Sequence, residues 1–475
     1  MIPYFVSLLL LGIPLMWVEW TIGRYGRLFG HGTAPGIFHS LWEKNRFIKY
    51  FGVIGIFGPL VIFVYYIYIE SWLLGYAYFA LTGAYRGADQ AGMQAFLSGY
   101  QGLQPHPLFP DIGWAYLFFL ITFAVNMWVL SRGVVKGIEW LNRWALPLLL
   151  LFAVTLAVRV LTLGAPDPAH PDWTTLAGLG FLWNPDLSAL RDADVWLAAA
   201  GQVFFTLSVG IGVILTYASY LSRQKDVALS GLTSVATNEF AEVILGGSIA
   251  IPIAFAFFGP GAIASVAKSG AFNLGFVSMP LIFQQIPWGE LFAFLWFALL
   301  FLAGLTSSIS LLEPAIAFVE DEFRLRRWQA SLTVGLLTLA ATQPVIFFLG
   351  KGVLDELDFW GGTFCLVLFA TVETLLFGWV FGIDRAWEEI HHGADLRVPR
   401  IYKFILKYVT PLFLIVILTA WFFQNGLPTI LMYDVPAANR PYVLATRLGL
   451  TAVFLGLCAL VRVAWRRRPV RQGTA

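Results

Sequence analysis

The sequence has few charged residues: they make up only 12% of its 475 residues, whereas 59% are hydrophobic. Soluble domains carry about 25% charged residues, so this composition argues against an ordinary soluble enzyme and excludes a disordered chain. The 30 basic and 28 acidic side chains nearly cancel to a formal net charge of +2, which leaves no strongly basic face for nucleic acid. These shortages predict an all-α integral membrane protein embedded in the lipid bilayer.

Motifs for soluble chemistry are also lacking. Cys365 and Cys458 both stand in apolar runs and suggest neither a disulfide framework nor a zinc site. No Walker loop, HExxH or GxSxG motif is present, and Gly210-Ile211-Gly212 lacks the third glycine of a dinucleotide fingerprint. No histidine falls within a predicted span. The sequence therefore supports neither ATP-driven pumping nor an enzyme.

Long apolar runs are what the sequence does contain. A membrane-spanning helix needs about 20 apolar residues, and eleven runs qualify. They are 2–23, 47–82, 113–131, 137–162, 195–221, 229–258, 289–318, 328–349, 359–382, 401–424 and 442–465. Lysine and arginine gather in the odd-numbered connections and in the tail after residue 465, which predicts that these parts, with the C-terminus, are cytoplasmic. A bacterial inner membrane is the expected location.

The beginning of the sequence conflicts with this topology. The first span must run from outside to inside, yet Met1 is followed directly by Ile2, Pro3 and Tyr4, with no basic flank or signal-peptide cleavage site. We weigh two interpretations: a short extracellular N-terminus, or a preceding span that is missing from this sequence. The loops 163–194 and 259–288 fall outside and are too small to be domains.

Charged side chains at membrane depth are costly and mark functional candidates. Glu19, Glu70 and Glu373 interrupt apolar spans, and the plainer interpretation is that each ties helices together by hydrogen bonds. Glu242 differs because other polar groups, Asn238 among them, surround it in the sequence.

Two polar segments inside spans predict a site. Gly201–Gly212 combines Gln, Thr, Ser and glycines in mid-span, which favours a broken helix lining a cavity, with a kinked packing helix as the alternative. Ala303–Ser308 carries hydroxyls at Thr306 and Ser307, which predict an oxygen site for a monovalent cation, although such hydroxyls also join helices.

The chain resembles the neurotransmitter:sodium symporters (the solute carrier 6 type), and the bacterial leucine transporter most closely. The resemblance runs over nearly the whole chain and is carried by collinear motifs. These are Gly12–Trp17, Glu19-Trp20, Gly23–Gly26, Tyr65–Trp72, Gln202–Gly210, Asn238-Glu239, Ala241–Ser248, Gly304–Ser308 and Asp355–Trp360. The resemblance implies the leucine-transporter-type fold of inverted repeats with broken helices.

On this resemblance the eleven spans would correspond to family helices 2–12, and the family's first helix would be absent. We expect Met1 to be an internal methionine chosen too late as the start; a chain truly lacking that helix should transport poorly or not at all. The implied division is 1–162 for the remnant of the first repeat (family helices 2–5), 163–194 for an extracellular loop, 195–382 for the second repeat (helices 6–10) with the extracellular loop 259–288, 401–465 for two further helices, and 466–475 for a cytoplasmic tail.

The resemblance also implies residue roles. The substrate would be bound by Ile62, Tyr66, Phe205, Thr206, Ser208, Ile211, Ser307 and Leu311. Sodium ions, the implied cofactors, would be ligated by Thr206 and Asn238 at one site, and by Ala303, Thr306 and Ser307 at a second. Tyr4, Gln202 and Glu242 would form a site where the carboxylate replaces chloride, and the gates would contain Phe205 and Asp358 outside and Tyr220 and Asp321 inside.

These assignments predict a sodium-coupled symporter of amino acids or related small zwitterions that works by alternating access and does not require chloride. Ile211 stands where the leucine transporter has a phenylalanine, which enlarges the pocket and favours a bulkier substrate. The alternative is a transport-inactive chain that acts as a sensor or scaffold. The resemblance leaves the oligomeric state open, with a homodimer as one possibility.

Overall fold

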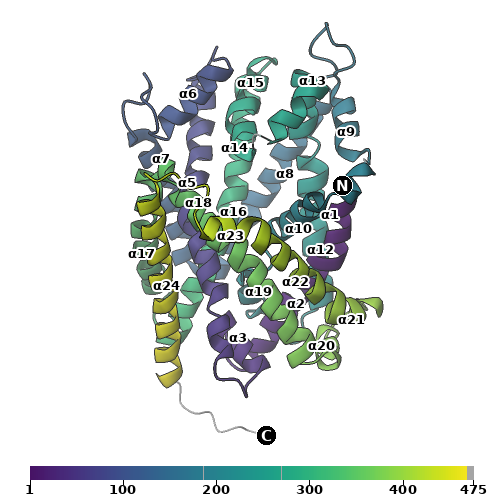
Figure 1. Cartoon of the computed structure of the whole chain (residues 1–475), viewed down its shortest axis with the longest axis vertical. Coiled ribbons are helices and arrows are strands. Elements are labelled where there is room, and N and C mark those ends of the chain that lie inside the picture. Colours follow the sequence, from purple (N-terminus) through teal and green to yellow (C-terminus); the bar gives the residue numbers. More distant parts are fainter. Residues whose placement is uncertain (186, 269, 468–475) are drawn as a thin grey trace. The chain divides into compact units, whose positions relative to one another are not determined.

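The computed structural model describes residues 1–185, 187–268 and 270–467, and these are almost entirely helical (Figure 1). Within those ranges there is no β-strand, only an isolated bridge between His106 and Phe109. Helices satisfy every backbone polar group internally, which a chain surrounded by lipid requires. The all-α fold class predicted from the sequence is confirmed.

Ten helical stretches of the described chain are long and apolar enough to cross a membrane. They are Ile2–Arg27, Ile48–Thr82, Gly113–Ser131, Val134–Leu161, Val227–Gly261, Gly289–Phe323, Arg327–Phe347, Val353–Val380, Ile401–Ile430 and Arg440–Arg467. Each overlaps a predicted span. The remaining predicted span, 195–221, is interrupted and forms two shorter helices, α10 (Ala193–Leu207) and α11 (Val213–Ala218).

The chain divides into two compact units, and three helices run from one into the other: α5 (Ile54–Thr82), α12 (Val227–Glu239) and α16 (Gly289–Phe323). Unit 1 consists of Met1, Tyr66–Asp186 and Ala236–Ile309. Its other elements are α6 (Gln90–Tyr100), α7 (Gly113–Ser131), η2 (Val134–Glu139), α8 (Trp140–Leu161), α9 (Thr175–Trp183), η4 (Phe240–Gly246), α13 (Ala250–Lys268), α14 (Ala271–Asn273), η5 (Leu274–Ser278) and α15 (Met279–Gln284).

Aromatic side chains form much of the core of unit 1. Tyr76 of α5 is fully buried, and its ring contacts those of Phe96 and Tyr100 on α6 and of Phe276 on η5. Elsewhere in this unit α9 packs along α13, where Gly259 adopts φ 75° and kinks the helix ahead of Pro260. The predicted extracellular loops 163–194 and 259–288 thus contain short helices.

Unit 2 consists of Ile2–Tyr65, Leu187–Val235 and Ser310–Ala475. Its remaining elements are α1 (Ile2–Ser7), η1 (Leu8–Gly12), α2 (Ile13–Arg27), α3 (Ala34–Leu41), α4 (Ile48–Phe51), η3 (Ser188–Arg191), α17 (Arg327–Phe347), η6 (Leu349–Lys351), α18 (Val353–Leu357), η7 (Asp358–Phe364), α19 (Cys365–Leu375), η8 (Leu376–Val380), α20 (Ile383–Ile390), α21 (Ile401–Phe404), η9 (Ile405–Val409), α22 (Thr410–Trp421), η10 (Phe422–Gly426), α23 (Leu427–Ile430) and α24 (Arg440–Arg467).

Helix α2 is the centre of unit 2, because it packs against α11, α19 and α20 and nearly all of its side chains are buried. The indole of Trp17 donates a hydrogen bond of 2.9 Å to the Ala228 carbonyl and joins α2 to α12. The two units reflect which residues contact each other and say nothing about structural symmetry. The predicted inverted repeats therefore remain a prediction. Most of the predicted cytoplasmic tail, residues 468–475, lies outside the described part of the chain.

Candidate substrate and ion site

The helix break predicted between residues 201 and 212 is present in unit 2. Helix α10 ends at Leu207, and the backbone passes through left-handed conformations at Ser208 (φ 53°), Gly210 (φ 77°) and Gly212 (φ 77°) before α11 begins. A left-handed conformation costs an ordinary L-residue about 1–2 kcal/mol, and glycine avoids that cost. The break thus releases backbone carbonyls and amides from helical hydrogen bonding in mid-span.

Close packing also requires the two glycines of the break. A side chain at Gly210 would stand 2.8 Å from the Leu366 carbonyl oxygen of α19, and one at Gly212 would stand 2.5 Å from the Gly55 carbonyl oxygen of α5. The Gly210 amide donates a 2.5 Å hydrogen bond to Glu19 Oε1 on α2. Glu19, which we expected to tie helices together, therefore holds the non-helical segment.

The predicted substrate residues of unit 2 lie on α5, α10 and α16 and in the break between α10 and α11. Ser208 and Ile211 belong to the break, Ile62 to α5 and Leu311 to α16. The side chains of Ile211, Ile62 and Leu311 are buried. Phe205, the predicted outer lid, is 51% exposed at the end of α10. A polar backbone together with apolar side chains suits a small amphiphilic molecule, and the substrate site itself stays a prediction.

Unit 1 brings together the predicted second sodium site. The hydroxyls of Thr306 and Ser307 each donate a 3.0 Å hydrogen bond to the Ala303 carbonyl, so one turn of α16 gathers three hard oxygen atoms. The side chain of Tyr66 on α5 hydrogen-bonds with that of Ser307. A predicted substrate residue and a predicted ion ligand are thus neighbours.

The other predicted sets draw on both units and remain predictions. In unit 1, Asn238 Nδ2 donates a 3.5 Å hydrogen bond to Glu242 Oε2 one turn along. In unit 2, Tyr4 and Gln202 lie on α1 and α10, which pack together, and Thr206 follows on α10.

A polar network beside the predicted ion ligands was not anticipated from the sequence. Asn126 of α7 donates a 3.4 Å hydrogen bond to Glu70 Oε1 and accepts one of 2.8 Å from the Ser308 hydroxyl. All three side chains are buried. The sequence does contain a signal for this network: Asn126 places an amide in the middle of an apolar span, and buried polar groups need hydrogen-bond partners.

The predicted gate residues have defined partners in unit 2. Asp358 Oδ1 accepts a 2.6 Å hydrogen bond from the Tyr65 hydroxyl, and Tyr220 donates one of 2.8 Å to Glu313 Oε1. Glu313 also forms an ion pair with Arg327. Asp321 lies close to Gly32: a Cβ atom added at Gly32 would stand 2.5 Å from Asp321 Oδ2.

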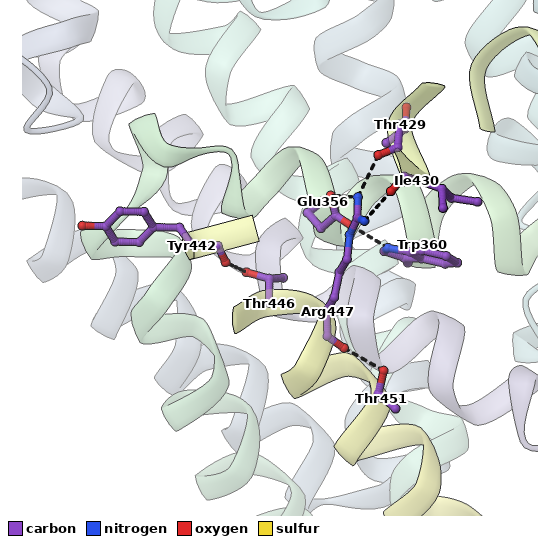
Figure 2. Close-up of polar contacts among 8 residues, drawn as sticks. All are labelled: Glu356, Trp360, Thr429, Ile430, Tyr442, Thr446, Arg447 and Thr451. Carbon is purple, nitrogen blue, oxygen red and sulfur yellow. Dashed lines mark hydrogen bonds and ion pairs between the residues drawn. The ribbon is translucent and has the colours of Figure 1, made fainter. Parts of the chain in front are cut away.

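A second unanticipated network holds α18, which leads directly to Asp358 (Figure 2). Arg447 of α24 forms a 2.6 Å ion pair with Glu356, and its two terminal nitrogens donate hydrogen bonds of 2.7 and 2.8 Å to the carbonyls of Ile430 and Thr429. The Trp360 indole donates 2.6 Å to the same glutamate. Both charges are therefore compensated although Glu356 is only 3% exposed.

Comparison with known proteins agrees with this architecture. The model of the sodium:neurotransmitter symporter family matches residues 103–467. An uncharacterised sodium-dependent transporter of Methanocaldococcus jannaschii is 30% identical over 435 residues, which cover 90% of this chain and 82% of that protein. Sodium-dependent nutrient amino acid transporter 1 of Drosophila ananassae is 29% identical over 311 residues, 63% of this chain and 46% of that protein.

A solved structure resembles the chain over most of its length. The crystal structure of MhsT in complex with L-phenylalanine has a TM-score of 0.72 and 30% sequence identity, with 88% of this chain and 90% of that chain covered. The leucine-transporter-type fold is thereby confirmed. The chain belongs to the sodium:neurotransmitter symporter family and is a multi-pass membrane transporter, not an enzyme.

Proposed function

We propose that this protein is a sodium-coupled symporter of amino acids that works by alternating access. The carrying observation is the break at Ser208–Gly212, which frees backbone groups beside buried apolar side chains in mid-span. Such a segment can match the charges of a zwitterion while the pocket receives its side chain. The names of the Drosophila relative and of the phenylalanine-bound structure support amino acids as substrates.

Sodium is proposed to bind at one site with Thr206 and Asn238, and at the second site at the oxygen atoms of Ala303, Thr306 and Ser307. Hard oxygen ligands suit a small hard cation, and uncharged hydroxyls favour a monovalent ion. The inward sodium gradient would drive accumulation because ion and substrate binding are coupled. We place the protein in the cell membrane, the inner membrane of a bacterium, with a cytoplasmic C-terminus.

We further propose a substrate with a large apolar side chain and transport that is independent of chloride. Ile211 leaves more room than a phenylalanine would, which favours a bulky amino acid. Glu242 places a fixed carboxylate one helical turn from Asn238, where it can take over the role of a bound anion.

Uptake of a panel of radiolabelled amino acids into proteoliposomes tests the function. We expect uptake of large apolar amino acids that requires an inward sodium gradient and continues when gluconate replaces chloride. Uptake without sodium would refute the symport mechanism. Collapse in gluconate would refute chloride independence alone, and sodium-dependent binding without uptake would favour the transport-inactive sensor.

A further inference from the structure

Two glutamates meet inside unit 2 at the helix break. Glu19 of α2 and Glu373 of α19 are both 0% exposed, and their carboxyl groups interact with each other. Glu19 Oε1 also accepts the 2.5 Å hydrogen bond from the Gly210 amide. The pair thus stands between the centre of unit 2 and the non-helical segment.

Positive charge does not compensate this pair. Among the described residues, Glu19 Oε2 and both carboxyl oxygens of Glu373 have no hydrogen-bond donor. Within the described parts of the chain, each carboxyl has the other as its sole charged neighbour, and Glu19 also interacts with the backbone of Gly210 and Leu215. Arg24, further along α2, is occupied by Glu389 and the carbonyls of Lys225 and His392.

Two ionised carboxylates in contact away from water are strongly disfavoured, by desolvation and by mutual repulsion. Two carboxylates also cannot hydrogen-bond to each other, because neither has a proton to donate. A single proton removes one charge and turns the contact into a hydrogen bond. We propose that Glu19 and Glu373 form a buried proton-binding site whose proton holds the broken helix in its binding conformation.

The geometry assigns the proton to Glu373. Glu19 already accepts a backbone hydrogen bond, and donors of this kind stabilise the charged form of a carboxyl. Protonated Glu373 then donates to Glu19, and Glu19 keeps its hold on Gly210. Loss of the proton leaves two negative charges face to face and pushes Glu19 away from the break.

The effect on transport rests on the proposed function, because Gly210 lies between the predicted substrate residues Ser208 and Ile211. Removal of the proton should therefore weaken amino acid binding. The proton site itself does not depend on that function, so the two are tested separately.

Infrared difference spectroscopy tests the proton directly. At neutral pH we expect a C=O stretch of a protonated carboxylic acid that is present in the wild type and in Glu70→Gln, lost in Glu373→Gln, and retained in Glu19→Gln, where Glu373 remains the acid. A band that is unchanged in Glu373→Gln would overturn the proposal. If Glu373→Gln does not fold, Glu70→Gln provides the test, because it removes the other buried glutamate outside the pair that lacks an ion-pair partner among the described residues; Glu313, Glu356 and Glu389 are ion-paired. The band must persist in Glu70→Gln. Its absence there would also overturn the proposal.

Binding of radiolabelled L-phenylalanine at fixed sodium tests the consequence. We expect wild-type affinity to fall with rising alkalinity, by up to about tenfold per pH unit for one linked proton. Glu373→Gln, which remains neutral, should bind without this dependence, and the exposed Glu388→Gln should behave as the wild type. The same alkaline loss in Glu373→Gln would overturn the coupling. A confirmed infrared band with no amino acid binding would count against the proposed function and leave the proton site standing.

Discussion

Single residues decide where the helix between residues 193 and 218 breaks. Gly212 combines φ 77° with a backbone oxygen 2.5 Å from the position of an added side chain, so two independent costs act there. We expect Gly212→Ala to lower the free energy of unfolding by at least about 1–2 kcal/mol from the left-handed conformation alone. Thermal unfolding in detergent measures the change.

The matched control is Gly449→Ala in α24, where an added side chain meets nothing within 4 Å and the backbone is helical. Alanine should be neutral there or stabilising by up to about 1 kcal/mol. Equal destabilisation by both substitutions would show that packing at the break is not specific.

The sequence predicted this break but not what holds it. Glycines and hydroxyls at 201–212 indicate a broken helix from local chemistry alone. Glu19 and Gly210 are 191 positions apart, and nothing in either segment specifies that they meet. Asn126 and Arg447 were missed for the same reason, because their partners are distant in sequence.

At the scale of elements, the Glu356–Arg447 ion pair joins α18 to α24 and the end of α23 (Figure 2). Arg447→Met leaves a buried carboxylate without its cation, which costs about 3–5 kcal/mol. We expect a marked loss of thermal stability. The double variant Glu356→Leu with Arg447→Met should lose less, since no charge remains unpaired; a double variant as unstable as the single one would contradict this account.

Asp226, just before the start of α12, joins two loops. Its carboxylate accepts hydrogen bonds from the amides of Leu229 (2.8 Å), Asp395 (2.7 Å) and Leu396 (3.3 Å). Burial alone would raise the pKa of Asp226, but the backbone donors outweigh it and lower the pKa below its ordinary value.

This shift makes the stability contribution of Asp226 dependent on pH. A lowered folded-state pKa gives stability that is fully present above the unfolded value of about 3.9 and is lost as the pH falls through the folded value. Asp226→Asn should therefore be less stable than the wild type at neutral pH, and the difference should shrink in acid. Unfolding followed against pH measures it, with the exposed Asp434→Asn as control. A difference that does not change with pH would exclude the carboxylate as its origin.

At the scale of the whole molecule, composition and hydropathy predicted the fold class because lipid leaves helices as the simplest solution for a chain of this kind. Spans followed from apolar length, except that 195–221 forms two helices. Residue roles came from resemblance, since a polar residue in a span indicates a site without identifying its partner. The predicted ligands Ala303, Thr306 and Ser307 are the favourable case, because one helical turn brings local sequence neighbours together.

The proposed coupling between ion and substrate would involve the whole molecule, and it gives the last prediction. If sodium raises amino acid affinity by some factor, the amino acid must raise sodium affinity by the same factor, because linkage is reciprocal. We expect Asn238→Ala to remove this mutual enhancement, since its side-chain oxygen is proposed to ligate the sodium that shares the substrate carboxylate. Radioligand and ²²Na⁺ binding to the same preparation measure both directions. Undiminished sodium dependence in Asn238→Ala would remove this residue from the ion site, whereas equal loss in both directions would support its proposed role as the link between the two ligands.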